Sequence, residues 1–337
     1  MLLKDIIYKG IETVSVLYPE GEAREMVFAY LEDVFGIRRH THVLEPDRSL
    51  SDTDSAKALS DFQRMASGEP LQYVTGKAYF YGREFRVSPS VLIPRPETEL
   101  LCRQMCEGIP SLSGGREPLG KCTGGFLQQA ADGEKEGDFG TACHKTGTSV
   151  LDLCTGSGCI AWTLALECPG TQVTAVDISE EALWVAQSQD FSEELSRTGA
   201  MMPIFVKADV LRRPDDCPEI CATDKKFDMI VSNPPYVMDS EKALMRSNVL
   251  DHEPHLALFV PDNDPLVFYR AVALWAKALL KENGEGMVEI NEALGQETAE
   301  IYIAEDFGYT EIVRDLHGKD RFVRFSKLPL RKKNRFF

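Results

Sequence analysis

A strand that runs into a glycine turn and then into a helix is the feature of this sequence that most restricts its fold. Residues 150–153 have the largely apolar composition of a buried strand, and Gly156 and Gly158 follow in a Gly-x-Gly-x-x-Ala spacing. Glycines at these positions permit a tight turn and allow a ligand to approach the backbone closely. The pattern predicts a Rossmann-like α/β domain with a ligand bound at the carboxyl ends of its strands.

An acidic residue ends the next strand-like segment. Asp177 follows residues 172–176 and lies about 20 residues beyond the glycine turn, where a carboxylate can bind both hydroxyls of a ribose. NAD and S-adenosylmethionine both contain a ribose, so this pattern alone leaves both cofactors open. The predicted cofactor-binding residues in this region are Cys154, Thr155, Gly156, Ser157, Gly158 and Asp177.

The motif Asn233-Pro234-Pro235-Tyr236 follows another strand-like run at residues 227–231. Two prolines cannot donate hydrogen bonds within a central strand, so the chain must leave the sheet at the edge where ligands bind. The amide oxygen of Asn233 and the carbonyl of Pro234 can accept hydrogen bonds from a planar NH2 group, and Tyr236 can pack against it. The motif could simply end a strand. Beside the glycine turn it favours a methyltransferase, because hydride transfer has no evident use for an amide clamp.

The glycine turn, Asp177, Asp209 and Asn-Pro-Pro-Tyr, in this order, resemble the class I S-adenosylmethionine-dependent methyltransferases that act on planar nitrogens. Two upstream segments, Pro-Leu-Gln-Tyr-Val-Thr-Gly at 70–76 and Val-Leu-Ile-Pro-Arg-Pro-Glu-Thr-Glu at 91–99, resemble the release factor glutamine N5-methyltransferases specifically. Adenine N6-methyltransferases of DNA also carry Asn-Pro-Pro-Tyr, so the upstream pair provides the specificity.

This resemblance implies a fold and a reaction. The fold would be α/β, with a seven-stranded Rossmann-like class I methyltransferase sheet joined to a small N-terminal helical bundle by a β-hairpin. The reaction would transfer a methyl group from S-adenosyl-L-methionine to the side-chain amide nitrogen (N5) of the glutamine in the Gly-Gly-Gln motif of peptide chain release factors, giving S-adenosylhomocysteine. The alternative is an adenine N6-methyltransferase acting on nucleic acid.

The resemblance also assigns roles to residues. Asn233, Pro234 and Tyr236 would be catalytic, with Pro235 completing the substrate pocket and Asn233 also near the cofactor. Glu253 would orient backbone or substrate groups beside the crevice. Asp209 and Val210 would bind the adenine amine. Cys154 stands where the family usually has its first glycine, and we expect the fit to survive unless that position needs a positive φ.

Changes in hydrophobic periodicity and composition suggest the domain boundaries. We expect a helical substrate-docking domain at 1–74, a β-hairpin and interdomain connection at 75–106, a Gly-rich flexible insertion at 107–148, a methyltransferase domain at 149–327 and a basic tail at 328–337. Within these domains the predicted helices are 3–17, 23–35, 51–65 capped by Ser51 or Asp52, 97–106, 160–167, 180–195, 266–280 and 296–306. The predicted strands are a hairpin within 71–94, then 150–153, 172–176, 202–209, 227–231, 286–290 and an antiparallel pair at 309–315 and 321–325.

Composition and charge restrict the partners. The chain has 37 basic and 53 acidic residues, a net charge of −16, which repels nucleic acid phosphates and is compatible with a basic protein partner. We expect no signal peptide and no membrane span, and a cytoplasmic location in which the nine cysteines are free thiols. We expect no metal site. Two further alternatives are a cofactor-binding module without catalysis and an NAD-dependent dehydrogenase.

Overall fold

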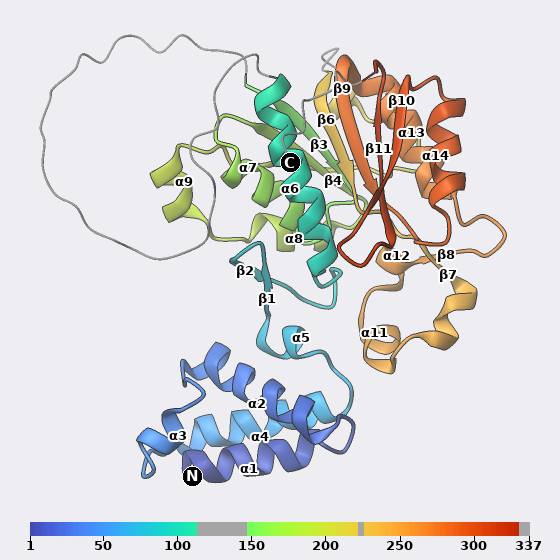
Figure 1. Cartoon of the computed structure of the whole chain (residues 1–337). Coiled ribbons are helices and arrows are strands. Elements are labelled where there is room, and N and C mark those ends of the chain that lie inside the picture. The colour runs from blue at the N-terminus through green and yellow to red at the C-terminus, as the bar shows by residue number, and fades with distance from the viewer. Residues whose placement is uncertain (113–146, 222–225, 330–337) are drawn as a thin grey trace, which may run out of the picture.

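The computed structural model describes residues 1–112, 147–221 and 226–329. Figure 1 shows a helical bundle at the N-terminal end, a short hairpin beyond it, and a larger sheet with helices on both faces. Most of the insertion and of the basic tail expected from the sequence lies outside the described residues, at 113–146 and 330–337. None of the helices in the described ranges is long and apolar enough to cross a membrane.

The central sheet has seven strands within the described residues, in the order β10-β11-β9-β6-β3-β4-β5. Neighbouring strands are parallel from β9 to β5, whereas β11 runs antiparallel to both β9 and β10. This confirms the predicted class I sheet and its antiparallel C-terminal pair. The strand bounds are β3 Ser149–Leu153, β4 Gln172–Asp177, β5 Ile204–Lys207, β6 Phe227–Ser232, β9 Leu280–Glu289, β10 Tyr309–Arg314 and β11 Asp320–Ser326.

Helices bury both faces of the sheet. On one face Val150 of β3 joins a core with α6 (Pro96–Leu112) and α7 (Cys159–Glu167). On the other face Leu151 and Leu153 join a core with α13 (Val267–Leu279) and α14 (Gly295–Ala304). Because successive side chains of a strand point to opposite faces and both faces are covered, β3 reads as an almost continuous apolar run.

The N-terminal bundle contains the predicted helices. Ser51 caps the third long helix by accepting a hydrogen bond from the Asp54 amide at 3.0 Å, which decides between the two predicted caps. The bundle core combines Ile6, Val27 and Phe62, all fully buried. Its helices are α1 Leu3–Val14, α2 Glu20–Phe35, α3 Thr41–Leu44, α4 Asp52–Ala66 and α5 Leu71–Thr75.

The segment between the bundle and the sheet differs from the sequence prediction in two ways. The predicted hairpin is present, but it is confined to β1 (Lys77–Phe80) and β2 (Arg83–Arg86), because residues 71–75 form α5. The predicted helix at 97–106 continues as α6 to Leu112, six residues into the expected insertion. Ile109 explains this extension, since it is buried in the same core as α7.

The predicted single helix at 180–195 is instead two helices, α8 (Glu180–Gln187) and α9 (Ser192–Thr198). Gln189 lies between them and uses its side chain to bind the hairpin, accepting from the Arg86 amide at 2.8 Å and donating to the Arg86 carbonyl at 2.9 Å. The same amide donates to the Ser157 carbonyl at 3.2 Å. The break in the helix therefore joins the hairpin to the glycine turn.

Two strand predictions also change in length. β5 is shorter than the predicted 202–209, and β9 begins at Leu280 rather than Gly286. Short elements surround the Asn-Pro-Pro-Tyr turn: β7 Val237–Met238, η2 Asp239–Leu244, α11 Ser247–His252, α12 His255–Leu258 and β8 Phe259–Val260, with η1 Pro214–Asp216 and α10 Pro218–Cys221 before β6.

Candidate active site

The glycine turn lies between β3 and α7 and contains three residues with positive φ: Cys154 at 62°, Gly156 at 55° and Gly158 at 79°. The Thr155 amide ties the turn to the neighbouring strand by donating to the Val176 carbonyl at 2.9 Å. The sequence predicts that Cys154 fits this position unless the position needs a positive φ. The structure shows that it does need one. A thiol side chain occupies a backbone conformation that glycine adopts without strain.

Asp177 ends β4 and faces the glycine turn. Its Oδ2 accepts from the Gly156 amide at 2.8 Å and its Oδ1 accepts from the Ser179 amide at 3.0 Å. Burial raises the pKa of Asp177, and these backbone donors oppose that rise by stabilising the ionised form. The carboxylate is thus held rigidly, and each oxygen retains a lone pair for a further donor.

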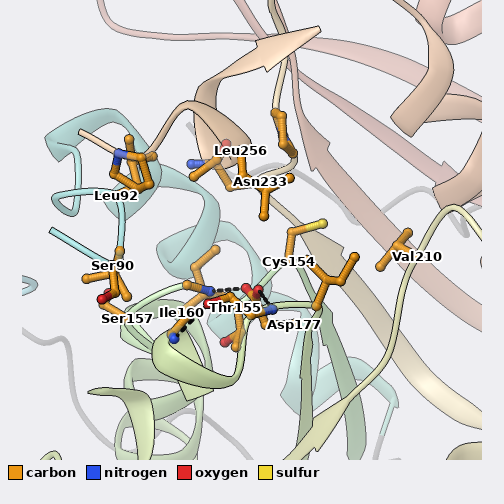
Figure 2. A pocket seen from close by; sticks show the side chains of 18 of the residues that line it. Ser90, Leu92, Cys154, Thr155, Ser157, Ile160, Asp177, Val210, Asn233 and Leu256 are labelled. Carbon is orange, nitrogen blue, oxygen red and sulfur yellow. Dashed lines mark hydrogen bonds between the residues drawn. The ribbon is translucent and has the colours of Figure 1, made fainter. Parts of the chain in front are cut away.

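A cavity of about 350 Å³ opens where the carboxyl ends of the parallel strands meet. Figure 2 shows Cys154, Asp177 and Asn233, which come from three different strand ends, around this cavity. The predicted site residues that line it are Cys154, Thr155, Gly156, Ser157, Asp177, Asp209, Val210, Asn233 and Pro235. The topology therefore brings together segments that lie far apart in the sequence.

Four predicted site residues do not line this cavity: Gly158, Pro234, Tyr236 and Glu253. At Gly158 a Cβ would lie 3.0 Å from the Cβ of Ala186 and 3.1 Å from Trp162, so this glycine permits close packing of α7. The sequence pattern located the turn but did not separate Gly158 from Gly156, which lines the cavity.

Glu253 joins two segments behind the cavity. Its Oε1 forms an ion pair with the Arg95 guanidinium at 2.6 Å, and its Oε2 accepts from the Ile93 amide at 3.2 Å. The Glu253 side chain is only 1% exposed. Glu253 therefore orients the backbone before α6 against the loop that follows α11, which is the first of the two roles that the resemblance implies. Its contact with substrate stays a prediction.

Asp209 and Val210 lie at the far end of the cavity, beyond β5. The Oδ1 of Asp209 accepts from the Leu211 amide at 2.9 Å, and its Oδ2 lies 3.7 Å from Arg212. The carbonyl of buried Val210 accepts from the Trp275 indole at 3.0 Å. Both residues line the cavity.

A chain of hydrogen bonds supports the Asn-Pro-Pro-Tyr turn. The Nδ2 of Asn233 donates to the Thr98 hydroxyl at 3.2 Å, and that hydroxyl donates to the Oε2 of Glu289 at 2.7 Å. The Tyr236 hydroxyl donates to the Oε1 of Glu289 at 3.1 Å. Burial raises the pKa of Glu289 to about 7, against the hydrogen bonds from Thr98 and Tyr236. A single buried carboxyl group thus connects both ends of the turn.

Sequence reasoning did not single out Thr98 or Glu289. Thr98 lies in the 91–99 segment, which carries the family resemblance and by that resemblance forms part of the active-site wall, but no role is given there to a single residue. Glu289 lies in a run interpreted only as a strand. An acid at the end of a buried strand is the same signal that identified Asp177, so Glu289 could have been found. Thr98 lines the cavity, as do Ser90, Leu92, Ile178 and Phe268, and none of these carries such a signal.

This sheet, with its glycine turn after β3, its acid at the end of β4 and its Asn-Pro-Pro-Tyr turn after β6, defines a class I S-adenosylmethionine-dependent methyltransferase. Two family models match the chain, the PrmC N-terminal domain at 14–76 and the methyltransferase small domain at 140–252.

Curated relatives identify the family. A release factor glutamine methyltransferase of Flavobacterium psychrophilum is 32% identical over 96% of this chain and 99% of its own length, and one of Bacteroides thetaiotaomicron is 33% identical over 93% and 95%. A bifunctional methyltransferase of Rickettsia typhi is 31% identical over 95% of this chain and 56% of its own length. The chain belongs to the release factor glutamine methyltransferase family.

Proposed function

We propose that this enzyme methylates the side-chain amide nitrogen of the glutamine in the Gly-Gly-Gln motif of a peptide chain release factor. The observation that supports this most is the position of Asn233, which lines the cavity at the end of β6 and carries an amide that can hold a planar NH2 group. Relatives that match this chain over nearly their whole length are named release factor glutamine methyltransferases. Because release factors act in translation, we place the reaction in the cytoplasm.

The residues around the cavity fit S-adenosylmethionine. A Cβ placed on Gly156 would meet no atom within 4 Å, so the backbone of the turn is open to a ligand. We assign the ribose hydroxyls to the Asp177 carboxylate and the adenine edge to Asp209 and Val210, while the turn from Cys154 to Ser157 holds the rest. When bound, S-adenosylmethionine supplies a methyl group on a positively charged sulfur.

The protein's task is to make a poor nucleophile react. The lone pair of an amide nitrogen is delocalised into its carbonyl, so positioning must supply much of the catalysis, up to roughly 7–11 kcal/mol in well-oriented reactions. We propose that the Oδ1 of Asn233 accepts one amide hydrogen of the substrate glutamine. Pro234 does not itself line the cavity but lies between two residues that do, Asn233 and Pro235, and we propose that its carbonyl accepts the other hydrogen where the substrate enters. Both contacts raise electron density on the nitrogen and aim it at the methyl group. As the N–C bond forms the C–S bond breaks, and the strongly acidic methylated amide then loses one N–H proton to solvent. Tyr236 acts from outside the cavity lining, through its bond to Glu289.

A protein substrate is favoured over nucleic acid. The chain carries a net charge of −16, which repels phosphates. A release factor loop presents its glutamine as a single side chain, whereas an adenine in a duplex must first be removed from the base stack at a cost of a few kcal/mol.

The test is methylation of a release factor by wild type and by Asn233→Ala, followed by mass spectrometry. Wild type should add one methyl group to the glutamine of Gly-Gly-Gln. Asn233→Ala should add none while its circular dichroism and thermal unfolding stay the same. Asn263→Ala, the same change at an exposed position outside the cavity lining, is the matched control and should remain active. No methyl group with wild type, or full turnover by Asn233→Ala, would overturn the proposal.

A further inference from the structure

The Asn233 side chain has two ends of almost equal shape, and they have opposite chemistry. Its Oδ1 accepts hydrogen bonds, whereas its Nδ2 only donates them. A substrate NH2 group needs an acceptor. If the Asn233 amide were turned over, two NH2 groups would face each other and the glutamine would be repelled. Catalysis therefore requires something that fixes the amide in one orientation.

The hydrogen bonds behind Asn233 fix that orientation. An ionised Glu289 can only accept, so it takes the single proton of the Thr98 hydroxyl across 2.7 Å. The Thr98 oxygen then has only lone pairs to offer, so the Asn233 atom 3.2 Å away must be the donor Nδ2. The Oδ1 of Asn233 is left for the cavity that Asn233 lines.

Burial makes this chain of bonds effective. Thr98 is 2% exposed and Glu289 is 1% exposed, so water cannot replace either partner. The second oxygen of Glu289 holds the Tyr236 hydroxyl, and Asn291, two residues further on, donates to the Tyr236 carbonyl at 3.2 Å. The carboxyl end of β9 therefore supports the turn along its length. The titratable or charged groups that interact with Glu289 are Tyr236, Arg321, Glu97, Tyr269, Cys102 and Cys159.

We propose that Thr98 and Glu289 are positioning residues that set the Asn233 amide with its oxygen toward the substrate nitrogen. They select an NH2 group over a carboxylate, and so a glutamine over a glutamate, without touching the reacting atoms. The inference deepens the proposed function and rests on it. It identifies the residues that let the site distinguish the substrate's amide from a carboxylate.

The decisive variant is Thr98→Val, which keeps the side-chain shape and removes the hydroxyl. Both orientations of Asn233 then become accessible and the roughly 10-fold bias set by one hydrogen bond is lost. The fraction in the productive orientation roughly halves, so kcat/KM for a release factor should fall about twofold. Thr98→Ser restores the hydroxyl and should recover most of the activity. Binding of S-adenosylmethionine, measured by calorimetry, should change by no more than about twofold, because about half of the molecules keep the wild-type orientation of Asn233.

A second measurement separates positioning from a general loss of structure. A release factor with Gly-Gly-Glu in place of Gly-Gly-Gln is used as a competitive inhibitor. Wild type should bind it poorly, because Oδ1 of Asn233 repels a carboxylate. Thr98→Val allows Nδ2 to face the cavity, so the inhibition constant of the glutamate form should improve about 10-fold relative to the KM of the glutamine form. A merely structural defect would weaken both.

Thr298→Val is the matched control. Thr298 is fully buried in α14, and its hydroxyl has no hydrogen-bond partner within the described residues. The kcat/KM of this variant, and its preference between the glutamine form and the inhibitory glutamate form, should match wild type. Equal kcat/KM in Thr98→Val and wild type, or an unchanged preference, would refute the positioning. Failure of wild type to methylate the factor at all would instead refute the proposed function.

Discussion

Replacing Cys154 with alanine and, separately, with glycine tests whether the first position of the glycine turn is strained. Cys154 has φ 62°, a left-handed conformation that disfavours any residue with a Cβ by roughly 1–2 kcal/mol. Glycine avoids this strain but loses roughly 0.5–1 kcal/mol through the greater freedom of the unfolded chain. We therefore expect Cys154→Gly to be more stable than Cys154→Ala by about 0.5–1 kcal/mol. Both variants remove the thiol, so its packing largely cancels from the comparison.

The assay is urea unfolding of the two variants with a control in the next helix. Ala161 lies within α7, where an ordinary helical backbone makes Ala161→Gly destabilising by about 1 kcal/mol or more. Glycine should thus be the better residue at 154 and the worse one at 161. Titration with S-adenosylmethionine should show that Cys154→Gly keeps its affinity, because the turn retains its path. If Cys154→Ala is as stable as Cys154→Gly, the backbone there is not strained and the reasoning is refuted.

Two further outcomes follow from the buried carboxyl groups. Burial raises the pKa of Glu289 from an ordinary 4.5 to about 7. Its contribution to stability is therefore full below about pH 4.5 and is lost as pH rises to about 7. Methylation should rise over the upper part of that range as the ionised form of Glu289 appears. Glu289→Gln should flatten both profiles relative to wild type; parallel profiles would contradict this. Glu253→Gln removes the ion pair with Arg95 and should lower the free energy of unfolding by about 1–3 kcal/mol. In a double-mutant cycle with Arg95→Met, the coupling energy between the two residues should exceed about 1 kcal/mol. Additive effects would show that the pair does not join the two segments.

Most of the fold could be predicted from the sequence because local patterns are strong there. The strand and glycine turn around Gly156 and the two final antiparallel strands appear as expected. The errors arise where tertiary contacts override local composition. The side chain of Gln189 binds the hairpin and breaks the helix predicted for 180–195, and Ile109 extends α6 because it reaches the core. Neither contact is visible in a window of neighbouring residues.

The cavity lining could be predicted in part, for a related reason. Residues at the strand ends, such as Asp177 and Asn233, are located by the topology alone, and both line the cavity. Tyr236 and Glu253 have side chains suited to substrate but turn to partners from other segments, Glu289 and Arg95. Sequence gives the chemistry of a side chain and its approximate place. Its direction depends on which distant group satisfies it.

Glu289 shows why that direction matters to function. When a buried carboxyl group with a raised pKa ionises, the folded state loses stability. At neutral pH the fold would therefore be more stable with a neutral side chain at position 289. A neutral glutamine, however, presents a donor as well as an acceptor, and it no longer forces the Thr98 hydroxyl to donate away from Asn233. Only an ionised group at this position fixes the whole chain of bonds in one direction. The site therefore exchanges some stability of the fold for a defined orientation of one amide.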